Sequence, residues 1–289
     1  MRLLAIVQCM RPHQYVKNLF IFLPLFFALK ITDVELLFNA FLAFVSFSLL
    51  ASGIYTLNDY HDIEEDKLHP KKKKRPLASG AISKGQAIAL MIFLFIVGLS
   101  IMAPLSLGAV AIVCAYIAMN IAYSLYLKHV AIIDVTIIAV GFVLRLFIGS
   151  AVTGIELSMW IVIMTFLLAL FMALAKRRDD VLIFLDTGKK MRKVIDGYNL
   201  QFLDSAMAIM ASVIIVAYTI FTTSADVITK FNSQYLYLTA LFVILGIMRY
   251  LQIAFVHLDS GSPTRIVIKD RFIQLTLLGW ILSYTWILY

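Results

Sequence analysis

Long apolar runs alternate with short or strongly polar connections along almost the whole chain. A window of about twenty apolar residues, which as a helix crosses the hydrocarbon core of a bilayer, predicts nine membrane-spanning segments. These segments cover about 17–31, 34–58, 84–103, 105–127, 131–150, 158–176, 204–224, 235–256 and 272–289. Long polar connections are expected at about 58–84, 176–204 and 257–271. The pattern therefore predicts an all-α integral membrane protein, with residues 1–289 forming a single membrane domain.

The composition agrees with a membrane protein and excludes other classes. Of the 289 residues, 62% are hydrophobic and 15% are charged, whereas soluble domains average about 45–50% apolar and 25% charged residues. Basic residues interleaved with aromatic ones do not occur, so the net charge of +8 does not indicate nucleic-acid binding. The two cysteines, Cys9 and Cys114, have no spacing typical of a disulfide or a metal site. The apolar stretch 1–10 is too short for a convincing signal peptide and is expected to form an interfacial helix.

The distribution of basic residues predicts the orientation. Of the 25 Lys and Arg residues, 22 lie in the amino-terminal segment or in connections that follow even-numbered segments. Cytoplasmic loops carry the excess of positive charge in membrane proteins. The amino terminus is therefore expected inside and Tyr289 outside.

One acidic stretch, 58–66, follows the second segment and has the sequence Asn-Asp-Tyr-His-Asp-Ile-Glu-Glu-Asp. If the preceding helix continues through it, Asn58, Asp62 and Asp66 rise along one face, because they are spaced by four residues. Carboxylates at this spacing repel one another unless a cation lies between them, and oxygen ligands of this kind suit Mg²⁺ bound to a phosphate-containing substrate. The simpler alternative is a solvated acidic helix end beside a basic loop.

Further charged residues are expected at the same membrane level, because each lies at the cytoplasmic end of a segment. They are Lys17, the basic run 71–75 that ends in Arg75, Lys128, Asp134 and the run Lys176-Arg177-Arg178-Asp179-Asp180. Carboxylates for a metal and cations for phosphate oxygens are together what a magnesium diphosphate requires.

These cations also have simpler interpretations. The run 71–75 is typical of a topology signal or a lipid-headgroup patch. Lys17 is typical of a snorkelling anchor, and Lys176 and Arg177 of a helix end. Arg145 lies about fourteen residues into its segment, where a charge needs a cavity, a partner or water, and we expect it to line a cavity.

Several stretches resemble a known family. The acidic motif resembles the first signature of the UbiA prenyltransferase superfamily, and nearly the whole chain from about residue 10 resembles its bacterial decaprenyl-phosphate phosphoribosyltransferase branch. The stretches that carry this resemblance are Arg11-Pro12-His13-Gln14-Tyr15-Val16-Lys17-Asn18, Asn58 through Asp66 with His69-Pro70, Arg75-Pro76-Leu77-Ala78-Ser79-Gly80, Tyr123-Ser124, Lys128-His129, Gly141-Phe142-Val143-Leu144-Arg145, Lys176-Arg177-Arg178, Ser262-Pro263-Thr264 and Lys269-Asp270-Arg271.

The resemblance implies nine helices around a central cavity open to the cytoplasm and an active site on that side. It also implies that the protein lies in the inner membrane of a bacterium. It implies that phosphoribosyl diphosphate (PRPP) donates its 5-phosphoribosyl group to a polyprenyl phosphate such as decaprenyl phosphate. Mg²⁺ would be held on the donor diphosphate by the catalytic residues Asp59, Asp62 and Asp66, with Asn58 as a ligand or hydrogen-bond partner. The substrate-binding residues implied are Lys17, Arg75, Lys128, Asp134, Lys176, Arg177 and Asp180. A homotrimer is expected, because the branch is known as trimeric.

The chain departs from aromatic prenyltransferases of the superfamily in one place. Those enzymes carry a second Asp-rich motif after the sixth helix, where this chain has Lys176-Arg177-Arg178-Asp179-Asp180. More cations and fewer carboxylates favour a donor with an additional phosphate. Two alternatives stay open: a UbiA-type aromatic prenyltransferase that uses a prenyl diphosphate, and a transporter of lipid phosphates or anions.

Overall fold

The computed structural model describes residues 2–68, 72–188, 193–259 and 263–288. His69, Pro70, Lys71, Ser262 and Tyr289, named above, lie outside the described residues. All regular structure in the described ranges is helical. Two compact units form, one from Met1–Leu127 with Gly141–Leu157 and the other from Lys128–Val140 with Ser158–Tyr289. We describe each unit by itself.

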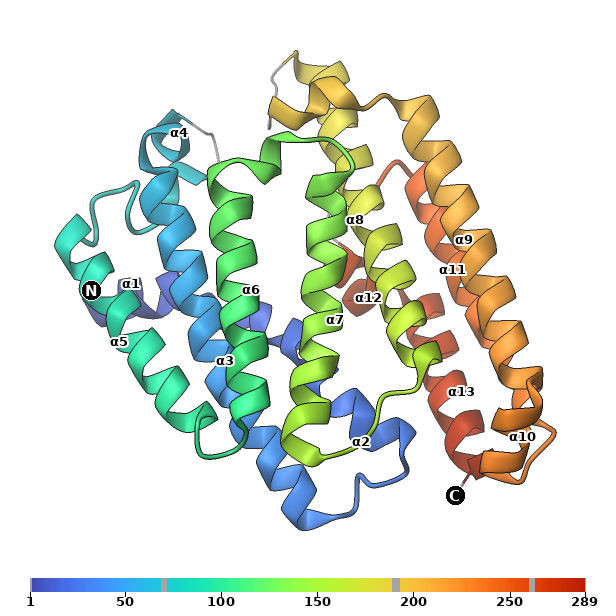
Figure 1. Cartoon of the computed structure of the whole chain (residues 1–289). Coiled ribbons are helices and arrows are strands. Elements are labelled where there is room, and N and C mark those ends of the chain that lie inside the picture. The colour runs from blue at the N-terminus through green and yellow to red at the C-terminus, as the bar shows by residue number, and fades with distance from the viewer. Residues whose placement is uncertain (1, 69–71, 189–192, 260–262, 289) are drawn as a thin grey trace. The chain divides into compact units, whose positions relative to one another are not determined.

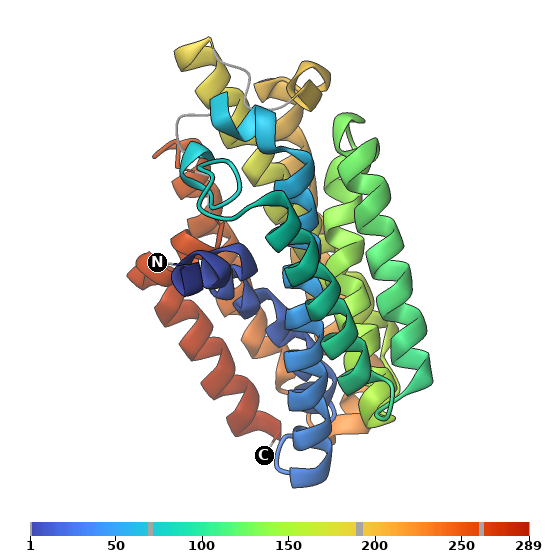
Figure 2. The ribbon, with the colours of Figure 1, turned by 90° about the vertical axis from the view of Figure 1, so that its left-hand side faces the viewer.

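The first unit is built around one long helix, α3, which is flanked by α5 and α6 (Figure 1). Its elements are α1 (Arg2–Met10), η1 (Pro12–Phe22), α2 (Leu23–Phe27), α3 (Val34–His61), α4 (Ile63–Leu68), η2 (Lys72–Lys74), α5 (Lys84–Met102), α6 (Leu107–Leu125) and the later part of α7 (Ile133–Thr153). Helix α1 forms as expected and runs crosswise to α3, against which it packs (Figure 2).

Small residues allow close approach inside this unit. On α5, a Cβ atom at Gly98 would lie 2.6 Å from Leu50 Cγ of α3. The Ser46 hydroxyl of α3 donates a hydrogen bond of 2.7 Å to the Gly98 carbonyl. On α7, a Cβ atom at Gly149 would lie 2.1 Å from the Ile21 carbonyl oxygen. Glycine is therefore required at these two positions, as at many helix contacts in membranes.

In the second unit, α9 packs against both α8 and α11, and α13 packs on α11 (Figure 1). Its core includes Phe171, Met207 and Tyr250. Its elements are η3 (Leu127–His129), the start of α7, α8 (Met159–Thr187), η4 (Lys193–Gly197), α9 (Leu200–Thr223), α10 (Ala225–Phe231), η5 (Leu236–Thr239), α11 (Ala240–Phe255), α12 (Pro263–Lys269) and α13 (Arg271–Leu288).

Eight helices of the described chain are long and apolar enough to cross a membrane. They correspond to the second through ninth predicted segments, so the chain is a multi-pass membrane protein. The first predicted segment, 17–31, instead forms the 3₁₀ helix η1 and the five-residue α2. Pro24 lacks an amide donor, which limits a regular α-helix through this segment. The Asn18 side chain also turns inward and donates to Ser48 Oγ at 2.9 Å.

Candidate active site

The acidic stretch follows a nearly continuous helical path. Helix α3 ends at His61, and Asp62 is its C-cap with φ −91° and ψ 11°. Helix α4 begins at the next residue and carries Asp66. The Asp62 amide donates to the Asn58 carbonyl at 3.0 Å, and the Asp66 amide donates to the Asp62 carbonyl at 2.8 Å. The spacing of four predicted for this stretch is therefore kept in the backbone, although the helix is interrupted at Asp62.

The two buried carboxylates of the stretch are Asp59 and Asp66, which are seven residues apart. One guanidinium joins them, because Arg75 Nη1 lies 2.9 Å from Asp59 Oδ1 and 2.7 Å from Asp66 Oδ2. Arg11 Nη2 contacts the same Asp59 oxygen. Lys72 Nζ lies 3.7 Å from Asp66 Oδ1. We call these five residues the Asp59 cluster.

The charges of the Asp59 cluster are arranged with the cations outside. Both carboxylates are 2% exposed, whereas Arg11 is 21% and Arg75 28% exposed. Three cations therefore cover two carboxylates. Asp66 Oδ1 is buried and accepts no hydrogen bond from the described residues. Lys72 Nζ gives this oxygen an ion pair at 3.7 Å but not a hydrogen bond, so among the described residues it keeps the capacity to accept one from a ligand.

The donor set fits Mg²⁺ only in part. Mg²⁺ is usually bound by one or two carboxylates, several waters and substrate phosphates, which Asp59 and Asp66 can supply. A preformed site of three side chains is not present, since no three Asp, Glu, His or Cys side chains in the described ranges come together to hold a metal. Asp62 is half-buried. Asn58 Oδ1 accepts a hydrogen bond from Ser124 of α6.

Arg145 has no carboxylate partner among its contacts in the described ranges but is well covered within the first unit. Its Nε donates to Asn18 Oδ1 at 2.9 Å and its Nη1 to the Gly141 carbonyl at 2.6 Å. Its guanidinium carbon lies 4.9 Å from the ring centre of Phe47 and 5.4 Å from that of Tyr116. This environment of rings and oxygens explains how a charge that is 4% exposed is tolerated. Arg145 is therefore satisfied by neighbours of its own unit, and Lys17, one residue before Asn18, is half-buried.

A second charged cluster lies in the second unit, and we call it the Arg177 cluster. Helix α8 continues to Thr187, eleven residues beyond the predicted end, and so carries 176–180 on a helix. Arg177 Nε donates to Asp134 Oδ2 of α7, and Arg177 Nη1 donates to Asp180 Oδ2 at 2.8 Å. The Tyr198 hydroxyl donates to Asp134 Oδ1 at 2.6 Å and accepts from the Ile132 amide at 2.7 Å.

The Arg177 cluster is closed to solvent. Arg177 is 1% exposed and Asp134 is 0% exposed. Burial, and then the hydrogen bond to Asp134, raise the pKa of Tyr198 above its ordinary value, so this hydroxyl stays a donor at neutral pH. Two of the predicted substrate-binding residues, Asp134 and Asp180, therefore accept hydrogen bonds from a third, Arg177. Of the other two predicted here, Lys128 is half-buried and Lys176 is exposed.

Two further ion pairs fasten helices of the second unit. Arg178 Nε donates to Asp204 Oδ1 of α9 at 2.6 Å, and Arg178 Nη1 donates to the Ala254 carbonyl of α11 at 2.7 Å. Arg249 Nη2 of α11 lies 2.8 Å from Asp270 Oδ2, just before α13. These contacts give Arg178 and Arg249 structural roles.

The sequence prediction missed Arg11 and Tyr198 as members of these clusters. The sequence prediction included Arg11 only as the first residue of the stretch Arg11–Asn18. Its position beside Pro12 was the available signal for a role in the Asp59 cluster. Arg11 adopts φ 54° and ψ 59° between α1 and η1, which directs the chain back toward α3. No local pattern pointed to Tyr198, because its partner Asp134 is 64 residues away.

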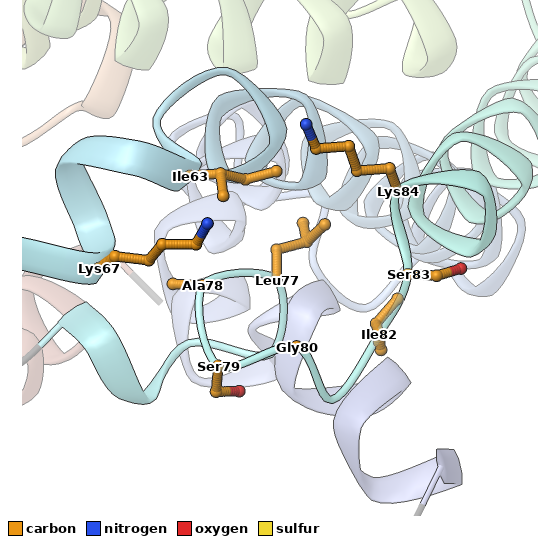
Figure 3. A pocket seen from close by; sticks show the side chains of 9 residues that line it. All are labelled: Ile63, Lys67, Leu77, Ala78, Ser79, Gly80, Ile82, Ser83 and Lys84. Carbon is orange, nitrogen blue, oxygen red and sulfur yellow. The ribbon is translucent and has the colours of Figure 1, made fainter.

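A pocket of about 420 Å³ lies on the connection between α3 and α5 (Figure 3). None of the predicted site residues lines it. The ammonium group of Lys67, one of its two lysines, is bound to Glu64 at 2.9 Å. The lining residues are Ile63, Lys67, Leu77, Ala78, Ser79, Gly80, Ile82, Ser83 and Lys84. The candidate site is therefore the Asp59 cluster and not this pocket.

Known proteins share both the sequence pattern and the fold. Residues 19–283 match the sequence model of the UbiA prenyltransferase family. Decaprenyl-phosphate phosphoribosyltransferase of Mycolicibacterium smegmatis is 30% identical, over 96% of this chain and 90% of that protein. Digeranylgeranylglyceryl phosphate synthase of Sulfolobus acidocaldarius is 29% identical, over 79% of this chain and 80% of that protein. A UbiA homolog from Archaeoglobus fulgidus, bound to GPP and Mg²⁺, superposes with a TM-score of 0.73 at 20% identity and covers 98% of this chain and 99% of that one.

Proposed function

Because the chain belongs to the UbiA prenyltransferase family, we propose that it transfers the 5-phosphoribosyl group of PRPP to a polyprenyl phosphate. The observation that carries this proposal is the Asp59 cluster, where two buried carboxylates face three cations and one carboxylate oxygen lacks a donor in the described chain. That arrangement suits a ligand with a metal on one side and phosphate oxygens on the other. The relatives named decaprenyl-phosphate phosphoribosyltransferase, at about 30% identity, favour a donor of the phosphoribosyl group, which PRPP carries on a diphosphate.

The chain's own residues would bind and orient the donor. Asp59 and Asp66, with Asp62 and Asn58 near them in sequence, would hold Mg²⁺ on the donor diphosphate. The ion would supply charge stabilisation as the diphosphate departs. Arg75 and Lys17 would contact phosphate oxygens, because both lie on the same unit as the carboxylates and keep part of their surface exposed.

The proposed reaction needs no general base. A phosphate oxygen of the lipid attacks C1 of the ribose, the bond from C1 to the diphosphate oxygen breaks, and the electron pair leaves with the diphosphate. The lipid phosphate is already an anion at neutral pH, so no proton has to be removed from it. The protein's task reduces to positioning two anions and stabilising the departing charge. We propose that this occurs on the cytoplasmic side of the inner membrane, where the predicted basic connections lie.

The roles that we propose for the charged residues of the second unit differ from the substrate-binding roles predicted from the sequence. Lys128 and Lys176 stay as candidates for phosphate contacts. Arg177 is a weaker candidate, because its guanidinium is buried against Asp134 and Asp180. The same pairing speaks against aromatic prenylation, which would use carboxylates at this place for a second metal. We therefore place Asp134 and Asp180 as positioning residues for Arg177.

One assay tests the proposal. Purified protein in detergent is supplied with PRPP labelled in its ribose, Mg²⁺ and decaprenyl phosphate, and the lipid fraction is analysed for label and by mass. We expect a labelled lipid and free diphosphate in equal amounts, and neither after chelation of the metal. A parallel reaction with geranyl diphosphate and 4-hydroxybenzoate tests the aromatic alternative. Product only in the second reaction, or in neither, contradicts the proposal.

A further inference from the structure

We propose that Arg11 and Arg75 are exchangeable counter-ions, which neutralise Asp59 and Asp66 before the donor binds and then move onto its diphosphate oxygens. This inference rests on the proposed function and deepens it. It adds Arg11 as a second diphosphate-binding arginine. It also predicts the order of events at the site, namely that metal and diphosphate bind together and not one after the other.

The geometry creates the competition. Arg75 Nη1 is within 2.9 Å of Asp59 and 2.7 Å of Asp66, so one nitrogen lies between the two carboxylates. Arg11 contacts the same Asp59 oxygen. An ion held by Asp59 Oδ1 and Asp66 Oδ2 at about 2.0–2.1 Å would take the place of Arg75 Nη1. An ion on the remaining carboxylate oxygens, such as Asp66 Oδ1, would still be repelled by two guanidinium groups of like charge. The metal and the two arginines therefore compete for the two carboxylates.

The two arginines have room to leave, because neither is fully enclosed. Arg11 is 21% and Arg75 28% exposed, whereas the carboxylates they cover are 2% exposed. Each belongs to a short connection: Arg11 links α1 to η1, and Arg75 directly follows η2. The Arg11 guanidinium carbon also lies 5.3 Å from the ring centre of Tyr55, which offers it a second contact during the move.

The diphosphate supplies the new partner. A guanidinium binds phosphate oxygens as well as carboxylates, often through two parallel hydrogen bonds. When the metal carries a diphosphate, each arginine exchanges a carboxylate for a phosphate, and the cluster's charge remains balanced. When the metal arrives alone, the displaced arginines have no anion to bind. Free metal is therefore expected to bind weakly, and the diphosphate to strengthen its binding.

Removal of an arginine has opposite effects on the two binding events, and this separates the exchange from a purely structural role. Arg75→Gln removes the competitor, so the metal alone binds more tightly. The same change removes a phosphate contact, so the metal with diphosphate binds more weakly. Coupling between ligands is typically 5–150-fold, and we expect about tenfold in each direction. Arg11→Gln is expected to act in the same directions.

The experiment measures Mn²⁺ binding by electron paramagnetic resonance on the full-length protein in detergent, with and without inorganic diphosphate. Lys67→Gln is the matched control, because it also removes one positive charge from the same connection, and Lys67 pairs with Glu64 and not with Asp59 or Asp66. We expect Lys67→Gln to change neither affinity by more than about twofold. Thermal unfolding checks that each variant is folded. Arg75→Lys, whose single ammonium is a poorer bridge between two carboxylates, replaces Arg75→Gln if the latter does not fold.

The outcomes are distinct. Opposite shifts in Arg75→Gln, absent in Lys67→Gln, support the exchange. Weakening of both affinities, or no change in either, overturns it while the proposed function stands. Tight Mn²⁺ binding by the unchanged protein without diphosphate overturns it as well. If the unchanged protein binds no Mn²⁺ even with diphosphate, the proposed function and the exchange both fail.

Discussion

The Asp59 cluster and the Arg177 cluster are built from the same groups but differ in what surrounds them. In each, one arginine joins two carboxylates. Arg177 is 1% exposed and its partner Asp134 also binds Tyr198, so the charges are satisfied inside the protein. Arg75 is 28% exposed, and Asp66 Oδ1 lacks a donor among the described residues. A buried pair with complete hydrogen bonds fixes helices together, whereas an incomplete one with partly exposed cations suits a ligand.

The largest expected effect tests the open cluster. Asp66→Asn keeps the size of the side chain but removes a metal-binding carboxylate, so turnover should fall about 1,000-fold, which corresponds to about 4 kcal/mol of lost transition-state stabilisation. Initial rates of labelled lipid formation measure this. The thermal midpoint should fall less than in the Arg177 variant below. Turnover within about tenfold of the unchanged protein would show that Asp66 holds no essential metal.

The closed cluster should respond in stability. Arg177→Met leaves the Asp134 carboxylate buried without its cation, which typically costs about 3–5 kcal/mol. Thermal unfolding in detergent should show a large drop in midpoint. The double variant Arg177→Met/Asp134→Leu should recover much of it, because an apolar pair replaces the charges.

The neighbouring arginine provides the control for that prediction. Arg178 is 3% exposed, but its partner Asp204 is 40% exposed and can be solvated without it. Arg178→Met should therefore lower the midpoint less than Arg177→Met. An equal drop in both would mean that the loss of apolar and hydrogen-bond contacts, and not the isolated Asp134 charge, controls stability.

The fold was largely predictable because membrane helices are encoded locally. Eight of nine predicted segments correspond to helices long enough to cross a membrane in the described ranges, since about twenty consecutive apolar residues leave few other structures for the backbone. The segment 17–31 was the exception. Its proline at position 24 was visible in the sequence, but the inward turn of Asn18 toward Ser48 depends on a helix residue 30 positions away.

The site was predictable in composition but not in pairing. The acidic stretch was found from its spacing, yet the pair that meets on one guanidinium is Asp59 and Asp66, not the column of Asn58, Asp62 and Asp66. Residues seven positions apart lie on the same helix face about as closely as residues four positions apart. The spacing alone therefore allowed either grouping, and burial against Arg75 selects the pair Asp59 and Asp66. For Arg177, the sequence indicated a cation but not that Asp134, 43 residues earlier, accepts its hydrogen bond.

A smaller effect sharpens the description of the closed cluster. Tyr198→Phe leaves Asp134 Oδ1 without its hydroxyl donor and the Ile132 amide without its acceptor. Unsatisfied buried polar groups cost about 1–3 kcal/mol, so the thermal midpoint should fall by less than in Arg177→Met. The affinity for Mn²⁺ with diphosphate should be unchanged. Tyr237→Phe, at an exposed tyrosine of the same unit, is the matched control and should leave the midpoint unchanged. An equal midpoint in both variants would mean that the Tyr198 hydroxyl adds nothing to the cluster.

The smallest effect concerns a pair at the surface of the second unit. Hydrogen bonds from Arg249, and a weaker one from the Ile273 amide, hold the pKa of Asp270 below its ordinary value of 3.8. The folded state therefore favours the charged carboxylate, and this stabilisation is present above pH 3.8 and is lost as the pH falls through the lowered value. Asp270→Asn removes the titrating group, so its thermal midpoint should decline less than that of the unchanged protein between about pH 5 and pH 3. Arg249→Gln should flatten the same decline, because it removes the cause of the shift. If both variants lose as much on acidification as the unchanged protein, the pair contributes nothing measurable to stability in acid.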